Sequence, residues 1–129
     1  MPSPISSSSA GRSTQAPVTL QNAAAANGNG ASLALSAASM DVLITILGAS
    51  TPVMTVAIEH SFDSGSTWSS AATRDLTATA ATLLTSIAAS TTIARLIYTV
   101  PPGATHVRAP VSSYVSGNVT VTAIERRVG

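Results

Sequence analysis

The chain has 129 residues and a formal net charge of +1, and charged side chains make up 9% of it, against about 25% in typical soluble domains. This length accommodates one domain of ordinary size with a tail, but not a β-propeller, whose blades need roughly 40–50 residues each. The charge balance argues against nucleic-acid binding, the lack of cysteine excludes disulfides, and no apolar run is long enough to predict a membrane-spanning helix.

The first 16 residues are rich in serine and contain Pro2, Pro4 and Gly11 but few apolar side chains. Such a segment cannot offset the entropy of ordering by burying apolar surface on its own. We therefore expect residues 1–16 to form a flexible arm, or an arm that becomes ordered on a neighbouring subunit, ahead of a β domain over residues 17–129. The start of the chain also lacks the apolar core of a signal peptide.

From residue 17 onward, short apolar runs alternate with turn-forming residues, a pattern typical of β-strands. Strands are predicted over residues 17–22, 31–36, 41–48, 53–61, 67–73, 82–88, 93–100, 105–111 and 119–125. The segment 76–92 also fits a helical stripe, but its many threonines favour a strand. This succession predicts an antiparallel, jelly-roll-like β-sandwich with Trp68 as the one large side chain of the core.

The run SFDSGSTW at positions 61–68 fits the pattern Ser-x-Asp-x-Gly-x-Thr-Trp, which resembles the Asp-box of sialidases and other propeller glycosidases. Aspartate side chains bond the backbone of their own turn, and glycine tolerates left-handed backbone angles. The motif residues are Ser61, Asp63, Gly65, Thr67 and Trp68. Because the motif occurs once and no propeller can form, we expect a structural hairpin here and not a catalytic centre.

No other residues have the spacing of an active site. Glu59 and His60 are adjacent in a predicted strand, so their side chains point to opposite faces. His106 is a lone strand histidine, and the five carboxylates are scattered along the chain. A metal site or a general acid–base pair needs several such groups converging on one point. We therefore expect no enzymatic activity, no metal and no cofactor.

The segment 53–127 combines a strand, the Asp-Ser-Gly-Ser-Thr-Trp hairpin, a strand ending in Pro-Pro-Gly, the tripeptide His-Val-Arg and the run Tyr-Val-Ser-Gly-Asn-Val-Thr-Val. This order resembles small β-sandwich virion proteins of tailed bacteriophages, which occur as head decoration (cement) proteins and as tail or baseplate accessories. The resemblance implies a structural protein of the capsid surface, assembled in the host cytoplasm as a dimer or trimer on the major capsid protein or other virion proteins.

The cement reading also agrees with the composition, because low charge and edge strands without lysine suit a chain that other subunits cover. We expect its contacts with the capsid to lie in the arm, at Pro4, Ile5 and Arg12, and at the C-terminal Arg126 and Arg127.

A second reading is a carbohydrate-binding or accessory module of a phage tail, baseplate or head fibre. Sugar sites use exposed aromatic rings that stack on the pyranose, with polar groups beside them. Aromatic residues are few in this chain, and Tyr114, beside a predicted turn, is the best candidate for such a contact. The sequence leaves both readings open.

Overall fold

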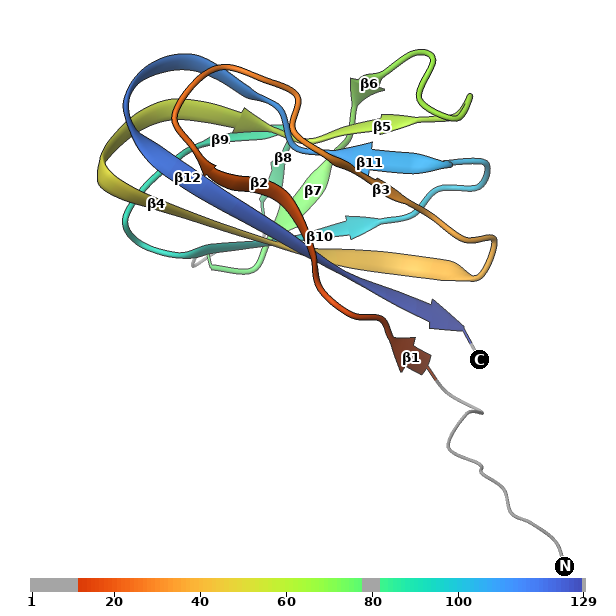
Figure 1. Ribbon diagram of the computed structural model, residues 1–129. Coiled ribbons are helices and arrows are strands. Elements are labelled where there is room, and N and C mark those ends of the chain that lie inside the picture. Colours follow the sequence, from red (N-terminus) through yellow and green to blue (C-terminus); the bar gives the residue numbers. More distant parts are fainter. Residues whose placement is uncertain (1–11, 78–81, 129) are drawn as a thin grey trace, which may run out of the picture.

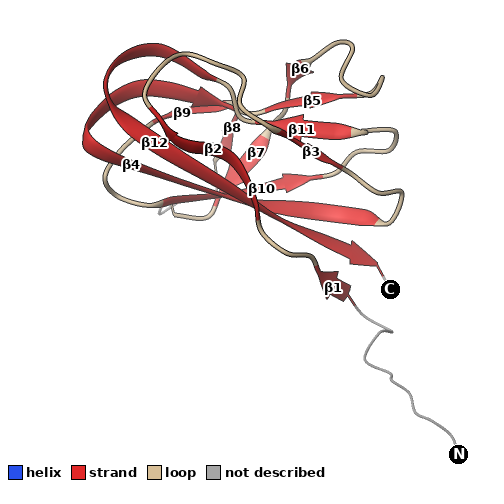
Figure 2. Ribbon diagram, in the orientation of Figure 1, coloured by secondary structure: helices blue, strands red, loops and turns tan. Residues whose placement is uncertain are grey.

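The computed structural model describes residues 12–77 and 82–128, and every regular element in this part of the chain is a β-strand (Figure 2). The strands are β1 (Arg12–Thr14), β2 (Val18–Ala24), β3 (Ser32–Ala34), β4 (Ser39–Ala57), β5 (Glu59–Ser61), β6 (Ser69–Ser70), β7 (Thr73–Asp75), β8 (Leu83–Leu84), β9 (Ser86–Ala88), β10 (Ala94–Thr99), β11 (His106–Arg108) and β12 (Val111–Val128). The predicted all-β class is confirmed.

The strands form two sheets, and within each sheet all paired strands are antiparallel. The larger sheet has eight strands in the order β1-β12-β4-β10-β7-β8, with β2 also beside β12 and β9 also beside β4. The smaller sheet has four strands in the order β3-β11-β5-β6. Figure 1 shows the two sheets as layers of a sandwich. The antiparallel sandwich agrees with the prediction, whereas the jelly-roll arrangement is not confirmed.

Two long strands join the sheets. β4 has 19 residues and β12 has 18, and they pair along most of their length. β4 continues into β5 after Ile58, and β11 leads into β12 through Ala109 and Pro110 (Figure 1). The β4–β12 pair of the large sheet is thus continued by the β5–β11 pair of the small sheet. The sequence predicted separate strands over 41–48 and 53–61. The intervening Ser-Thr-Pro instead makes an irregularity within β4, where Ser50 and Thr51 have positive φ angles of 59° and 56°.

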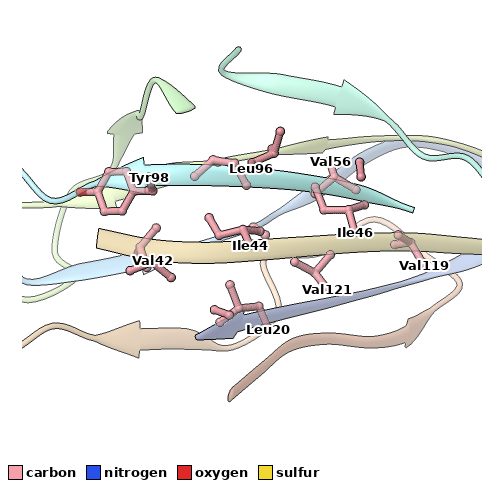
Figure 3. Packing of buried hydrophobic residues seen from close by; sticks show 14 of the residues in the cluster. Leu20, Val42, Ile44, Ile46, Val56, Leu96, Tyr98, Val119 and Val121 are labelled. Carbon is pink, nitrogen blue, oxygen red and sulfur yellow. The ribbon is translucent and has the colours of Figure 1, made fainter. Parts of the chain in front are cut away.

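The core lies between the sheets and follows the alternation of the strands (Figure 3). β4 contributes Val42, Ile44 and Ile46, each 2% exposed or less. The largest fully buried side chain is Tyr98 of β10, at 1% exposure. Trp68, which the sequence suggested as the large core residue, is only partly buried, because it lies beside the 61–68 turn at the end of the small sheet.

The end of the predicted arm is part of the sandwich. Residues 12–14 form β1, which pairs with residues 126–128 of β12 in the same chain. Residue 15 continues this pairing, since its backbone N–H donates to the carbonyl of Glu125 at 2.9 Å. Pro4 and Ile5, expected to contact a partner, lie outside the described residues.

Candidate functional site

The pairing of β1 with β12 places both ends of the described chain at one edge of the large sheet. Thr14 is opposite Arg126, Ser13 is opposite Arg127, and Arg12 is opposite Val128. Three of the residues predicted to contact a partner, Arg12, Arg126 and Arg127, therefore lie close together. The sequence grouped them as chain ends, but only the strand register brings them to one place.

Arg126 forms an ion pair with Asp41 of β4. Its Nε donates to Oδ1 of Asp41 at 2.6 Å, and its second guanidinium nitrogen contacts Oδ2. The hydrogen bond and the charge of Asp41 raise the pKa of Arg126. Asp41 and Arg126 are register partners in adjacent strands, so the pair joins β4 to β12. Sequence reasoning missed Asp41, which is 85 positions away from its partner.

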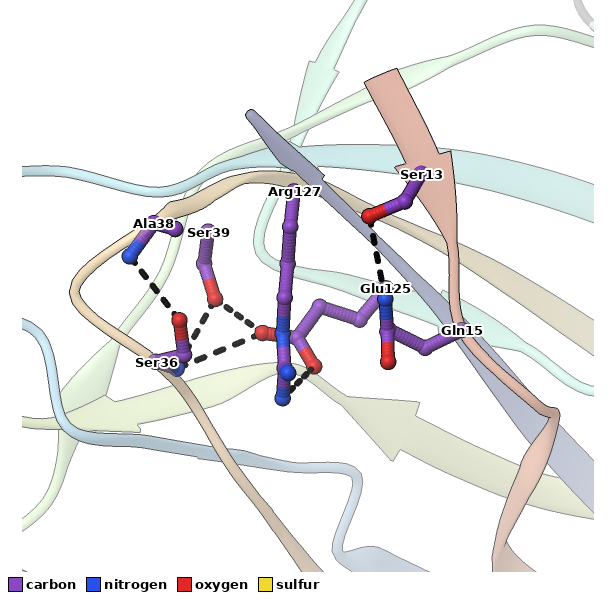
Figure 4. A network of polar contacts seen from close by, with 7 residues as sticks. All are labelled: Ser13, Gln15, Ser36, Ala38, Ser39, Glu125 and Arg127. Atoms are coloured by element: carbon purple, nitrogen blue, oxygen red, sulfur yellow. Dashed lines mark hydrogen bonds and ion pairs between the residues drawn. The ribbon is translucent and has the colours of Figure 1, made fainter. Parts of the chain in front are cut away.

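Arg127 contacts the buried carboxylate of Glu125, which is 2% exposed (Figure 4). A guanidinium nitrogen of Arg127 lies 3.1 Å from Oε1, while the Ser39 hydroxyl and the Ser36 backbone N–H donate to Oε2. Burial alone would raise the pKa of Glu125, but the hydrogen bonds from Arg127, Ser39 and Ser36 lower it overall. Both C-terminal arginines are thus engaged with carboxylates of their own chain.

A groove of about 590 Å³ lies at the same end of the sandwich. It runs between the β3–β4 turn and the β10–β11 turn, and its lining includes Leu35, Ser36, Ser39, Val100, Pro101 and Thr105. None of the residues that line the groove carries a titratable side chain. The groove can therefore offer apolar contact and hydroxyl hydrogen bonds, but no acid–base or nucleophilic pair.

The SFDSGSTW hairpin is held by hydrogen bonds to Asp63. Its Oδ1 accepts from the Thr67 backbone N–H at 2.8 Å and from the Ser61 hydroxyl at 2.7 Å, and its Oδ2 accepts from the Thr67 hydroxyl at 2.6 Å. These bonds, those from Thr67 first, lower the pKa of Asp63 to about 2. Gly65 has a φ of 89°, which a side chain would strain. Each group serves the turn, and the carboxylate faces no partner suited to catalysis.

Trp68 closes the hairpin and contacts the small sheet. Its indole N–H donates to the Gly65 carbonyl at 3.1 Å, and the Arg108 guanidinium lies 4.1 Å from the ring centroid. Arg108 also pairs with Glu59 at 2.7 Å. Arg108 and Glu59 are register partners in β11 and β5, so this cluster fastens the hairpin to the sheet below it.

His60 faces the other side of the small sheet, as the adjacent positions of Glu59 and His60 predicted. Its Nδ1 lies 2.8 Å from the Tyr98 hydroxyl, and its ring meets Phe62 edge-on at 4.7 Å. Burial lowers the pKa of His60 and raises that of Tyr98 to about 12. At neutral pH the imidazole is therefore uncharged and the phenol protonated, and a hydrogen bond joins them whose donor is set by the tautomer of His60.

Tyr114, the candidate sugar contact, has both polar groups occupied. Its hydroxyl donates to the Gly117 carbonyl at 2.9 Å, and its backbone N–H donates to the Asn27 side chain at 2.9 Å. The ring packs against the core cluster at the irregular part of β12. These contacts give Tyr114 a role in shaping this bend.

The described residues also bear on two other classes of site. No three side chains among His, Cys, Asp and Glu come together there as a metal site would require. No helix in that part of the chain has the length and apolar character needed to cross a membrane.

Fold and site together define a small antiparallel β-sandwich whose carboxylates hold turns and strand junctions. No family model and no curated protein matches the sequence. Two solved structures share the fold. The SPBc2 prophage-derived protein YomS has a TM-score of 0.75 and 19% identity, covering 89% of this chain and 94% of YomS. The PBSX exported protein XepA has a TM-score of 0.76 and 13% identity, covering 98% of this chain but only 45% of XepA. At these identities the likeness establishes the fold.

Proposed function

We propose that this chain is a non-enzymatic structural protein of a phage virion, and specifically a capsid decoration (cement) protein that clamps adjacent major capsid subunits. The observation that carries the proposal is the fold shared with YomS over nearly the full length of both chains, because YomS is described as prophage-derived. The fold shared with XepA, an exported protein of PBSX, supports the same origin.

The use of the charged residues supports a structural role. Asp41, Glu59 and Glu125 each pair with an arginine of a neighbouring strand or of the same strand, and Asp63 accepts hydrogen bonds within its turn. The groove beside the chain ends is lined by uncharged residues. These arrangements supply stability and contact surface, which is what a cement protein requires.

We place the proposed clamp at the end of the sandwich where β1 meets β12. Arg12 begins β1 beside Val128, and the arm that precedes it would bring Pro4 and Ile5 to the same capsid neighbourhood as Arg126 and Arg127. A stable contact of this kind buries about 800 Å² on each partner. Assembly as a dimer or trimer would multiply such contacts. Light scattering of the purified chain would detect a dimer or trimer that forms in solution.

The proposal can be tested with heads of the encoding phage assembled without this protein. The purified full chain is mixed with these heads, sedimented and quantified across a concentration range. We expect saturable binding at a fixed number of copies per head, and heads that retain their DNA at higher temperature once the protein is bound. Absence of binding to the heads would contradict the proposed function.

A further inference from the structure

The outer face of the large sheet, opposite the core, carries a row of aliphatic side chains across three adjacent strands. β4 lies between β10 and β12 (Figure 1). Leu43 of β4 is the register partner of Ile97 in β10 on one side and of Ile124 in β12 on the other. Each alternates with fully or nearly fully buried residues, so all three point away from the core. Leu47, further along the same face of β4, is 43% exposed.

Two arginines lie next to this apolar row. Arg74 of β7 is the register partner of Ile97, and Arg95 precedes Ile97 by two positions in β10, so both share its face. Arg74 and Arg95 occupy diagonal positions on adjacent strands, a separation of about 7–8 Å between backbones. Both side chains are exposed.

These two arginines differ from the others whose side chains the structure describes. Arg108, Arg126 and Arg127 each have a carboxylate within 3.1 Å. Within the described ranges, no ion pair involves Arg74 or Arg95. Since Arg108, Arg126 and Arg127 are each paired with a carboxylate, Arg74 and Arg95 are the arginines with described side chains whose positive charge remains unpaired.

The other described side chains of this face carry no net charge. One neighbouring row consists of threonines, with Thr45 of β4 opposite Thr122 of β12 and Thr122 opposite Thr19 of β2. On the other side of the apolar row, Asp41 and Arg126 neutralise each other. The face therefore combines an apolar centre, hydroxyl groups along one side and two unpaired positive charges at one corner.

We propose that this outer face, defined by Leu43, Ile97, Ile124, Arg74 and Arg95, binds a protein surface with an apolar centre and carboxylates that meet the two arginines. A second copy of this face would bring no free carboxylate to the two arginines, because Asp41, the carboxylate described on it, is already paired with Arg126. The inference rests on the proposed function, in which the acidic partner is a subunit of the phage head.

The test compares two double variants with the same change in net charge. Arg74→Gln with Arg95→Gln removes both charges from the face, and Asn27→Asp with Asn29→Asp lowers the net charge equally at two exposed positions of the loop between β2 and β3. We expect the arginine variant to bind heads about tenfold or more weakly and with less dependence on salt, because charge pairs at an interface govern both. The asparagine variant should bind like the wild type.

A third variant, Leu43→Thr, tests the apolar row, since threonine already occupies neighbouring positions of this face. It should also weaken binding to heads, while thermal unfolding shows that all the variants remain folded.

Equal binding by the wild type and the arginine variant would overturn the inference alone, as would equal weakening by both double variants. Comparable binding to free double-stranded DNA, lost in the arginine variant, would also overturn it. If the wild type does not bind heads, the proposed function fails and the inference fails with it.

Discussion

At the scale of single residues, Asp63 offers a direct test of the hairpin. Its carboxylate accepts hydrogen bonds from Thr67 and Ser61, which lower its pKa from 3.8 to about 2. The folded state thus holds the ionised form more strongly than the unfolded chain does, and the resulting stability is present above pH 4 and lost as pH falls towards 2. We expect Asp63→Ala to lower Tm by several degrees at neutral pH.

Thermal unfolding followed by circular dichroism between pH 5 and pH 2 measures this contribution. The Asp63→Asn variant is the matched control, because it keeps the size of the side chain and removes its titration. Its Tm should fall less than that of the wild type between pH 5 and pH 2. Identical pH profiles for the two proteins would show that the carboxylate does not stabilise the turn.

A second residue-scale prediction concerns His60. Burial beside Tyr98 and Phe62 lowers its pKa below 6.5, so the unfolded chain takes up a proton that the folded chain resists. Stability should therefore decrease as pH falls below about 6.5. Urea midpoints at pH 7.5 and 5.5 measure this slope. His60→Gln should reduce it, whereas His106→Gln, which retains His60, should not; equal slopes in both variants would contradict the prediction.

Single residues show clearly what the sequence can and cannot provide. The hairpin residues were found from a local motif, because Asp63 and its donors lie within six positions of one another. The pairs Asp41–Arg126 and Glu59–Arg108 were not found from the sequence, because their residues lie 85 and 49 positions apart, respectively. Such pairs depend on strand register, which no local pattern specifies.

At the scale of elements, the bend shared by β4 and β12 requires glycine at position 117. Gly117 has a φ of 76°, and a Cβ there would lie 2.6 Å from the Cα of Pro52 and 2.7 Å from the Ala49 carbonyl oxygen. We expect Gly117→Ala to cost at least about 2 kcal/mol of unfolding free energy, through overpacking and backbone strain. Chemical denaturation measures this change.

Gly28→Ala is the matched control for this prediction, because a Cβ at Gly28 would have no atom within 4 Å. That variant should unfold within about 0.5 kcal/mol of the wild type. If Gly117→Ala were equally stable, the bend would not depend on the close approach of β12 to Pro52.

The order of the elements was harder to predict than their type. Alternation of apolar and polar residues identified β10 and the C-terminal half of β12, since these strands have one buried and one open face. The same reasoning divided β4 at Ser50 and Thr51, which read as a turn but form a bulge within a continuous strand. β4 stays continuous because it pairs with β12 on both sides of the bulge.

β1 separates two parts of the predicted arm that can be tested independently. Deleting residues 1–11 leaves β1 and its pairing with β12 in place, so Tm should stay unchanged while binding to heads weakens. Deleting residues 1–16 also removes the backbone bonds of β1 to residues 125–128, so Tm should fall. Sedimentation with heads and thermal unfolding provide the two readouts. Full binding by the shorter deletion would contradict a role of the arm in the clamp.

At the scale of the whole molecule, composition and architecture agree. A chain with 9% charged residues uses three of its carboxylates in ion pairs and two in turns, and it leaves an aliphatic row on the outer face of its large sheet. A surface of this kind is suited to being covered by other subunits. The low content of charged residues could be seen in the sequence. The location of the unpaired Arg74 and Arg95 could be found only from the fold.

The most direct measurement of the central claim is the location of the protein on intact virions of the phage that encodes it. Antibodies raised against the purified chain and conjugated to gold would be imaged on these particles by electron microscopy. The proposal predicts label distributed over the head surface in many copies. Label confined to the tail or baseplate would contradict the cement role. If intact virions carry no label and denatured virions also lack the protein, a structural role in the particle would be contradicted.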